Sequence, residues 1–342
     1  MNARSESNPY RAIIHPRPAG EKRPLWSVMI PTYNCAGYLR ETLGGVLAQD
    51  PGRESMQIEI VDDCSTKDDP QSVVAELGGT RVEFYRQSEN MGLSRNFNTC
   101  LQRARGRLVH VLHGDDGVRP GFYEQMQRAL SDNASAGAAF CRYISMDECG
   151  HWLSIAKLER QDTGVLDAWL KKIATGQRLQ TPCMVVRREV YESLGGFDHR
   201  LSYSEDWEMW VRIAASYPVA YTPEPLALYR VHSVSSTARG ILTGANGRDL
   251  RKAISIIETQ LPQEIARSAP GQARKAYADA CIRRGHRALA ISHRAAVASQ
   301  IRDALQTELS LRVVANAAYL WLRSCAKTVS RLLPSNQIGV GP

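Results

Sequence analysis

WSVMIPTYNCAGYLRETLGGVLAQDPGRESMQIEIVDDCST, residues 26–66, contains the pattern that decides the fold. Two apolar runs of strand length, 26–31 and 56–63, enclose a stretch at 36–49 in which apolar residues recur at helical spacing. Each run ends in a cluster of polar residues. A strand, a helix and a second strand in this order are typical of the βαβ unit of a parallel sheet.

The same alternation continues as far as the acidic pair at residues 115–116. Apolar runs predict strands over 82–87 and 107–116. Helical spacing predicts helices over 70–77 and 94–104. We therefore expect an α/β fold with a Rossmann-like, mostly parallel sheet flanked by helices. In such sheets, ligands bind beyond the carboxyl ends of the strands.

Length and charge divide the chain into parts. Its 342 residues, 43% of them hydrophobic, suffice for one large α/β domain plus an appendage. Residues 1–240 contain 28 Lys and Arg against 29 Asp and Glu, whereas residues 241–342 contain 15 against 6. We expect an N-terminal extension over 1–24, a main domain over 25–240 and a basic helical C-terminal region over 241–342. Because the main domain is near neutral, the charge of +8 does not indicate nucleic-acid binding.

Cysteine usage and hydropathy bear on the compartment. Eight cysteines are scattered without a CxxC pair, which favours free thiols in a reducing compartment and argues against a zinc site. No stretch approaches the roughly 20 consecutive apolar residues of a membrane span, and the first residues lack the pattern of a secretion signal. We expect a cytoplasmic protein, soluble or peripheral at the inner face of the cell membrane.

Polar clusters follow the four predicted strands. They are PTYN (31–34), DDCST (62–66), ENMGLSRN (89–96) and HGDD (113–116). Taken singly, each is typical of a turn or a helix cap. Because the carboxyl ends of parallel strands meet at one edge of the sheet, we expect all four clusters to form one site.

The motifs SVMIPTYN, IEIVDDCST, NMGLSRNFN and LHGDD resemble, in order and approximate spacing, those of the family 2 glycosyltransferases. The resemblance covers roughly residues 26–235 and implies the GT-A fold, with a nucleotide-binding half over 25–120 and an acceptor half over 121–240. It implies an inverting enzyme that moves a sugar from a nucleotide-diphosphate donor to a glycan or lipid-linked acceptor, in cell-surface polysaccharide or glycoconjugate biosynthesis. It also implies a divalent cation, Mn²⁺ or Mg²⁺.

Asp115 and Asp116 resemble the DxD-type element that holds this cation against the donor diphosphate. Adjacent carboxylates repel each other, and a cation that prefers oxygen ligands offsets the repulsion. The usual pattern has an acid where this chain has His113, which leaves open which carboxylate binds the metal. By the same resemblance His232, followed by Ser233, lies near the metal or the diphosphate.

The resemblance also implies a set of donor-binding residues. Asp62 or Asp63 would accept a hydrogen bond from the base, and Arg95, in the first turn of a predicted helix, would pair with phosphate or base oxygens. The residues that would line the base and ribose or assist the phosphates are Pro31, Thr32, Tyr33 and Arg230.

The segment SEDWEMWVRI (204–213) carries two acids in the first turn of a predicted helix, with Trp207 and Trp210 on its buried side. Acids there interact favourably with the helix dipole, so a structural role is one alternative. By resemblance to the family's ED motif, Asp206 is the catalytic base that deprotonates the acceptor hydroxyl, and Glu205 orients or contacts the acceptor.

The C-terminal region has no comparable motif. Residues 247–310 carry Ala, Leu and Ile at helical spacing, which predicts two or three packed helices. Residues 311–333 combine a basic stripe with Tyr319 and Trp321, a composition typical of a helix in a membrane interface. The alternative is that this helix packs against the main domain or against a second copy of the chain, in a homo-oligomer.

Two other classes of protein share parts of this pattern. A nucleotidyltransferase has a similar architecture and metal-binding carboxylates, but it needs a glycine-rich phosphate loop with a lysine, which SVMIPTYNCAGY lacks. A sugar-nucleotide-binding protein without catalysis has no need of Asp206 in its SED context. The sequence does not identify the sugar, the nucleotide or the acceptor.

Overall fold

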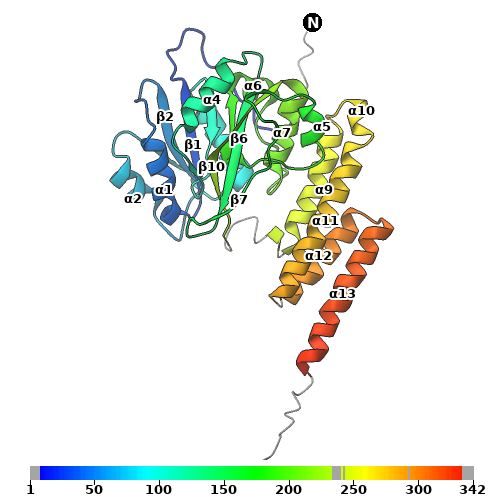
Figure 1. The fold of residues 1–342 in the computed structure, drawn as a ribbon. Coiled ribbons are helices and arrows are strands. Elements are labelled where there is room, and N and C mark those ends of the chain that lie inside the picture. The colour runs from blue at the N-terminus through cyan, green and yellow to red at the C-terminus, as the bar shows by residue number, and fades with distance from the viewer. Residues whose placement is uncertain (1–7, 233–239, 242, 292, 333–342) are drawn as a thin grey trace, which may run out of the picture.

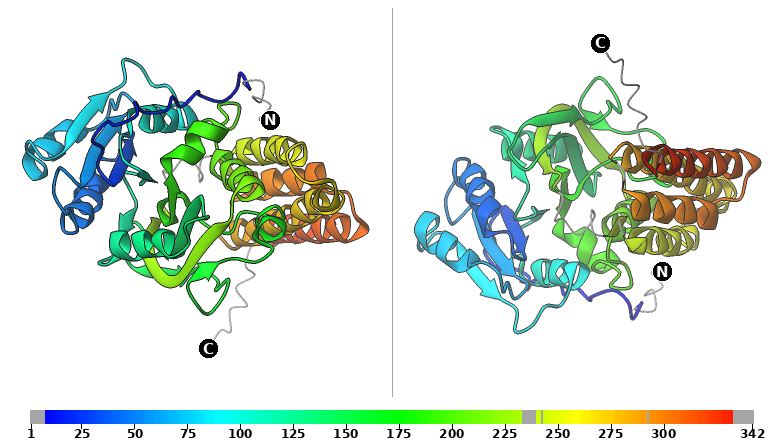
Figure 2. Two further views of the ribbon diagram at one scale, coloured as in Figure 1. Left: turned by 90° about the horizontal axis from the view of Figure 1, so that it is seen from above. Right: turned by 90° about the horizontal axis from the view of Figure 1, so that it is seen from below.

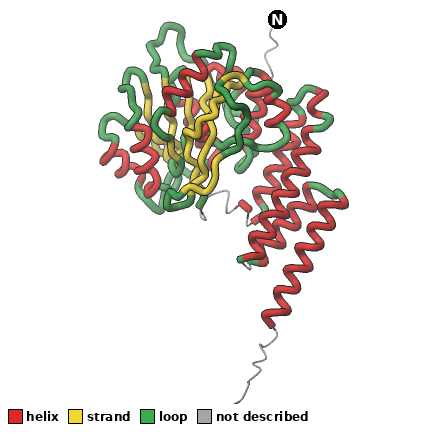
Figure 3. The backbone as a smooth tube through the Cα atoms, in the orientation of Figure 1, coloured by secondary structure: helices red, strands yellow, loops and turns green. Residues whose placement is uncertain are grey.

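The computed structural model consists of an α/β main domain with a stack of helices on one side (Figure 1). It describes residues 8–232, 240–241, 243–291 and 293–332, and beyond residue 326 only the backbone. Figure 3 shows strands in the main domain and only helices in the C-terminal region. Among the described residues, no helix combines the length and the apolar character needed to span a membrane.

The main domain is built on one ten-stranded sheet. Its strands are β1 (Trp26–Thr32), β2 (Met56–Asp62), β3 (Glu83–Arg86), β4 (Leu108–Val111), β5 (Gly117–Val118), β6 (Ala138–Met146), β7 (Trp152–Ile155), β8 (Gly164–Val165), β9 (Met184–Arg187) and β10 (Val219–Arg230). The order is β3-β2-β1-β4-β9-β6-β10-β5, with β7 paired to β6 and β8 to β10. The strands β3, β2, β1 and β4 are mutually parallel, and β9 is antiparallel to both of its neighbours.

Helices connect and cover these strands. They are α1 (Ala36–Leu47), α2 (Pro70–Leu77), α3 (Leu93–Arg103), α4 (Phe122–Ser131), α5 (Trp169–Ile173), α6 (Arg188–Leu194) and α7 (Glu205–Ser216). Every residue of β1 and β2 is buried, as in parallel sheets whose two faces are covered, and this explains why both strands are rich in apolar residues. The polar side chains of Gln57 and Glu59 in β2 are buried as well and bond to each other. The α/β fold predicted from the sequence is confirmed.

The fourth predicted strand is shorter than expected. It ends at Val111 rather than at residue 116, and the chain then turns, with the Asp116 N–H donating to the carbonyl of His113 at 3.1 Å. Gly114 lies so close to β1 that an added Cβ would be 2.6 Å from Thr32 Cγ2. The turn therefore brings the two aspartates against the end of β1, and only glycine fits at its centre.

The helix α7 is more deeply buried than its sequence predicts. Trp207 and Trp210 are buried as expected, but Glu208 and Arg212 on the opposite side are buried as well. Glu208 forms ion pairs with Arg212 at 2.9 Å and with Arg11 of the N-terminal segment at 3.0 Å. Because these charges neutralise each other, the polar side of the helix can lie inside the protein.

The C-terminal region consists of α9 (Ala245–Glu258), the short α10 (Gln263–Ala266), α11 (Ala269–Ala290), α12 (Arg294–Thr307) and α13 (Leu311–Leu332). In Figure 2 these helices lie together beside the main domain. Ile254 and Ile257 of α9 and Ala273 of α11 belong to the same hydrophobic core as Trp207 and Trp210. The first helices of this region therefore extend the core of the main domain.

Candidate active site

One cavity of about 980 Å³ opens at the carboxyl ends of β1, β2 and β4. The polar clusters that follow these strands all contribute to its wall, as expected for a sheet of this type. The residues predicted from the sequence that line it are Pro31, Thr32, Tyr33, Asp63, Asp115, Asp116, Glu205, Asp206, Arg230 and His232. Asp62 and Arg95 do not line it, and Ser233 lies outside the described residues.

The two aspartates at the end of β2 have different surroundings. Asp62 is fully buried, accepts hydrogen bonds from Ser65 and forms an ion pair with Arg86 at 3.1 Å. Asp63 lines the cavity and accepts the N–H groups of Met91 and Gly92, at 2.8 and 3.0 Å, so that it joins the end of β2 to the start of α3. Burial raises the pKa of Asp63. Of the two alternatives, Asp63 is the one in reach of a ligand.

Arg95 does not face the cavity, contrary to the expectation that it points to this edge of the sheet. Leu93 and Asn96 line the cavity, whereas Arg95 is exposed. Residues three apart share one face of a helix, and a residue two positions from the first points to the opposite side. Since α3 begins at Leu93, the direction of Arg95 follows from this spacing.

Two histidines hold the acidic pair after β4. His232 Nε2 lies 2.9 Å from Asp115 Oδ2, and His113 Nδ1 lies 3.0 Å from Asp116 Oδ2. The ligand atoms of His113, Asp115 and Asp116 all lie within 4.8 Å of one another. Within the described residues, His113 Nε2 and His232 Nδ1 are buried without a hydrogen-bond partner. The bond to Asp116 raises the pKa of His113 to about 9 despite its burial, so this ring acts as a hydrogen-bond donor to the pair. The carboxylate oxygens, with the imidazole of His232 beside them, fit a divalent cation such as Mn²⁺.

The pKa values of the two carboxyls are shifted in opposite directions. Burial raises the pKa of Asp116 to about 6, despite its bond to His113. Burial also acts to raise the pKa of Asp115, but the hydrogen bond from His232 and the charge of His113 outweigh it, so this pKa is lowered. Asp115 is also the more exposed of the two side chains, 27% against 1%. Asp115 is therefore the more acidic and the more accessible member of the pair.

Arg230 at the end of β10 holds Asp115 and Asp116 in place. Its backbone N–H donates to Asp116 Oδ1 at 2.8 Å, and its Nε donates to the carbonyl of Asp115 at 2.9 Å. The remaining guanidinium nitrogens bind Glu41 and the carbonyls of the turn between β6 and β7. Because these protein groups occupy a guanidinium that is itself buried, Arg230 positions the aspartates and leaves little capacity for phosphates.

Glu205 and Asp206 begin α7 on the other side of the cavity. Asp206 Oδ2 accepts hydrogen bonds from Gln177 at 2.6 Å and Thr181 at 3.3 Å, and its Oδ1 accepts the Trp207 N–H at 2.7 Å. Burial raises the pKa of Asp206 to about 6. Burial and the charge of Asp206 raise the pKa of Glu205 to about 8. Of the two carboxyls, Glu205 therefore holds a proton more strongly, and Asp206 is the one that loses its proton first as the pH rises.

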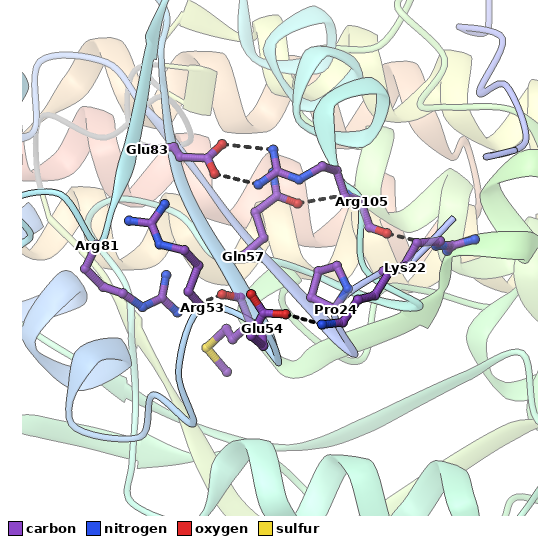
Figure 4. A pocket seen from close by; sticks show the side chains of 10 residues that line it. Lys22, Pro24, Arg53, Glu54, Gln57, Arg81, Glu83 and Arg105 are labelled. Atoms are coloured by element: carbon purple, nitrogen blue, oxygen red, sulfur yellow. Dashed lines mark hydrogen bonds and ion pairs between the residues drawn. The ribbon is translucent and has the colours of Figure 1, made fainter. Parts of the chain in front are cut away.

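A second, smaller cavity of about 300 Å³ lies near the amino ends of β1 and β2 (Figure 4). It is rich in Arg and Lys, but acids neutralise most of them. Arg105 forms two hydrogen bonds with Glu83, at 2.9 and 2.5 Å, and Lys22 pairs with Glu54 at 2.6 Å. We assign no function to this cavity.

Residues 27–195 match the model of glycosyl transferase family 2, a span that includes the acidic pair and the strands that carry it. The chain belongs to glycosyl transferase family 2. The matched span of this family 2 glycosyltransferase ends before Asp206 and His232, so their assignment depends on the geometry above.

Relatives of this family 2 glycosyltransferase are distant. An uncharacterized protein of Mycobacterium tuberculosis is 28% identical over 272 residues, which cover 75% of this chain and 83% of that protein. An uncharacterized glycosyltransferase of Rickettsia typhi is 27% identical over 222 residues, covering 63% of this chain and 66% of that protein.

Solved structures share the GT-A fold at low sequence identity. The UDP complex of S. aureus TarS has a TM-score of 0.61 at 16% identity, covering 88% of both chains. A mannosyltransferase of Pyrobaculum calidifontis, solved with GDP-Man and Mn²⁺, has a TM-score of 0.56 at 19% identity, covering 94% of this chain and 91% of that chain. The GT-A architecture predicted from the sequence is thereby confirmed.

Several lining residues of the glycosyltransferase were not identified from its sequence. Gln177 and Thr181, which bind Asp206, precede β9, and Lys67 follows the DDCST cluster. Tyr277 and Arg284 of α11 also line the cavity, although α11 carries no recognisable motif. The sequence of α11 could not identify it as part of the site, because only the packing of the helices brings it to the cavity.

The pKa of Asp206 predicts how the activity of the glycosyltransferase varies with pH. A base acts only when deprotonated, so kcat/KM should be constant above about pH 6 and fall about tenfold for each unit below it. A pH profile of kcat/KM at saturating Mn²⁺ measures this fall on the acid side, which is the acid limb of the profile. The limb should vanish in Asp206→Asn, and an unchanged limb in that variant would assign it to another group.

Proposed function

We propose that this protein is an inverting, metal-dependent glycosyltransferase that moves a sugar from a nucleotide-diphosphate donor to a glycan or lipid-linked acceptor in cell-surface polysaccharide or glycoconjugate biosynthesis. The observation that carries the proposal is the pairing, within one cavity, of a carboxylate–imidazole cluster with the buried base Asp206. The carboxylate–imidazole cluster suits a diphosphate with its cation, and Asp206 suits removal of a proton from the acceptor.

At the donor end, Asp115 would hold the cation, with Asp116 and His232 supporting it. A cation bound there neutralises the charge of the leaving diphosphate. Tyr33 and Asp63 would contact the nucleoside, together with Pro31 and Thr32. Neighbours solved with UDP-GlcNAc and with GDP-Man and Mn²⁺ support a nucleotide-sugar donor and a divalent cation.

At the acceptor end, Asp206 would take the proton from the hydroxyl that attacks the anomeric carbon. Gln177 and Thr181 hold its Oδ2, which orients the carboxylate toward one substrate position. The neighbouring Glu205, whose pKa of about 8 keeps it mainly protonated at pH 7, is a poor nucleophile, and this supports direct displacement by the acceptor, which inverts the anomeric centre. The protonated Glu205, whose Oε2 is buried without a partner in the described part of the chain, would donate a hydrogen bond to the acceptor.

Binding of nucleoside diphosphates tests the proposal. A ligand present at 100 times its Kd adds about 2.7 kcal/mol to the free energy of unfolding, which raises the melting temperature by several degrees. We expect UDP or GDP to produce this shift with Mn²⁺ and a much smaller one with EDTA. A shift produced by nucleoside triphosphates alone would favour the nucleotidyltransferase alternative, and binding without turnover of the sugar donor would favour the non-catalytic one.

The exposed surface of α13 supports a location at the inner face of the cell membrane. Successive residues turn by about 100° around a helix, which divides α13 into three faces. One face packs against the other helices and consists of Val313, Ala317, Leu320 and Ser324, all buried. The next is exposed and apolar, with Leu311, Val314, Trp321 and Leu322, and the third carries Arg312 and Arg323. An apolar face beside a basic one suits an interface of anionic lipid.

We therefore expect the full chain to sediment with anionic vesicles at low salt and less at high salt. The double substitution Trp321→Ser, Leu322→Ser should abolish sedimentation, because both side chains are more than half exposed and lose nothing inside the protein. Arg323→Ala should weaken it by about 1 kcal/mol. The side chains of Lys327 and Arg331 lie outside the described residues.

Arg248→Ala, which removes an exposed charge from α9 instead, is the matched control and should leave vesicle binding unchanged. If intact protein does not bind vesicles but dimerises, and the double substitution abolishes dimerisation, then α13 is the interface of a homo-oligomer and the membrane proposal is wrong.

A further inference from the structure

The C-terminal helices supply part of the cavity wall. On α11, Ala273, Ala276, Tyr277, Ala280 and Arg284 all line the cavity. These positions are spaced by three, four, seven and eleven residues from the first, so they share one face of the helix. At about 1.5 Å per residue this face runs for roughly 16 Å. Its alanines leave room along the helix, and larger side chains occur only at Tyr277 and Arg284.

Arg284 has no partner for its charge. In the part of the chain that the structure describes, it forms no ion pair, and its Nη1 is buried without a hydrogen-bond acceptor. Its contact is with the ring of Tyr277, whose centroid lies 5.6 Å from the guanidinium carbon. Among the stretches that are not described, only residues 1–7 contain an acidic residue. A buried N–H without an acceptor costs about 1–3 kcal/mol, more when it is charged.

Other arginines near the cavity are fully used by the protein. Arg230 binds both aspartates of the acidic pair, and Arg212 binds Glu208. Arg251 on α9 pairs with Asp303 at 3.6 Å. These arginines maintain the structure, whereas the guanidinium of Arg284 remains free for a ligand.

The helix that carries Arg284 belongs to the group that packs around α7. Asp206 begins α7, α7 packs against α9, and α9 packs against α11. The acidic pair that suits the donor diphosphate belongs to the turn after β4, in the other half of the domain. Tyr277, whose hydroxyl donates to Asn246 at 2.9 Å, is buried, and its ring contacts the guanidinium of Arg284.

We propose that Arg284 binds an anionic group of the acceptor, a phosphate or a carboxylate, while an acceptor hydroxyl reaches Asp206. This inference rests on the proposed function and narrows the acceptor to an anionic chain. A guanidinium binds either group through two parallel hydrogen bonds, so the site fits both sources of negative charge. The ring of Tyr277 supports the guanidinium in this position.

The test measures binding of three soluble probes to the full chain, in the presence of Mn²⁺ and UDP or GDP. The probes are an oligouronate, its carboxyl-reduced neutral form and an oligo(glycerol phosphate) of similar length. Calorimetry should show one or both anionic probes binding at least about tenfold more tightly than the neutral one. A preference between the two anionic probes identifies the source of the charge.

Arg284→Ala should abolish this difference, and Arg284→Lys should retain part of it. The matched control is Arg283→Ala, which removes an exposed charge from the adjacent position on another face of α11 and should change nothing. Melting curves of all three variants establish that each is folded. Equal affinity for neutral and anionic probes, or equal loss in Arg283→Ala and Arg284→Ala, would overturn the inference.

Failure of this inference is distinguishable from failure of the proposed function. Nucleoside diphosphate binding with Mn²⁺ is measured on the same samples and does not depend on Arg284. If the nucleotide binds and Arg284→Ala leaves probe binding unaltered, the anion site is wrong and the glycosyltransferase proposal stands. If no nucleoside diphosphate binds, the proposed function itself is wrong.

Discussion

Asp206→Asn should lower turnover by about 10²-fold or more, with little change in the Mn²⁺-dependent affinity for a nucleoside diphosphate. The amide keeps the shape of the side chain and its bond from the Trp207 N–H, but it cannot accept a proton. Since Asp206 lies in the acceptor half, the donor site remains intact. Steady-state kinetics with a saturating donor, together with calorimetry of the nucleotide, measure the two effects separately.

Glu205→Gln is the matched control. Burial and the neighbouring charge hold the pKa of Glu205 at about 8, so at pH 7 this residue is a neutral acid, and an amide resembles it in shape and charge. We expect Glu205→Gln to retain most of its activity at pH 7. Comparable losses in the two variants would mean that Asp206 is not the single base and that the pair acts as a unit.

Asp115→Ala should abolish the part of nucleoside diphosphate binding that depends on metal. Asp115 is the more accessible and the more acidic member of the acidic pair, and its Oδ2 bonds to His232, which leaves its other oxygen for a cation. Affinity for UDP or GDP in Mn²⁺ should fall to the value that the unaltered protein has in EDTA. Titration of the nucleotide with and without Mn²⁺ gives both values.

A control for Asp115→Ala is Asp162→Ala, which removes an exposed acid that does not line the cavity and should leave Mn²⁺ dependence unchanged. Asp116→Asn serves as a comparison, because its Oδ1 can still accept the Arg230 N–H, whereas an amide group replaces the oxygen that pairs with His113, and the melting temperature should fall as well. If Asp115→Ala keeps full Mn²⁺-dependent binding, the cation is held elsewhere and the assignment of this pair is wrong.

The regular elements of the first half could be predicted because their signals are local. β1 and β2 are buried over their whole length and rich in apolar residues because both faces of the sheet are covered, and runs of this kind can be recognised in the sequence. The polar residues that follow these strands could also be predicted to lie together, since the geometry of a parallel sheet brings the carboxyl ends of its strands to one edge. Those residues account for most of the cavity-lining positions identified in advance.

The predictions for two arginines differ from the structure, because the direction of each side chain depends on where a helix begins or on how distant segments pack. Arg95 was expected at the cavity, but α3 begins at Leu93, which turns Arg95 outward. Arg230 was expected to assist the phosphates, but the aspartates and the turn after β6 occupy its donors. The direction of Arg95 depends on the residue at which α3 begins, and the role of Arg230 depends on partners distant along the chain.

The sequence by itself determined the α/β fold, the edge of the sheet that carries the site and the acidic pair after β4, because strand period, helix period and polar strand ends are properties of neighbouring residues. The tertiary structure alone decided which of Asp62 and Asp63 lines the cavity, how burial separates the pKa values of Glu205 and Asp206, and that Arg284 shares their cavity. Desolvation and the approach of α11 arise only when elements far apart in the chain pack together. The pattern of residues that are adjacent in the sequence therefore predicts neither the burial of these carboxyls nor the position of α11.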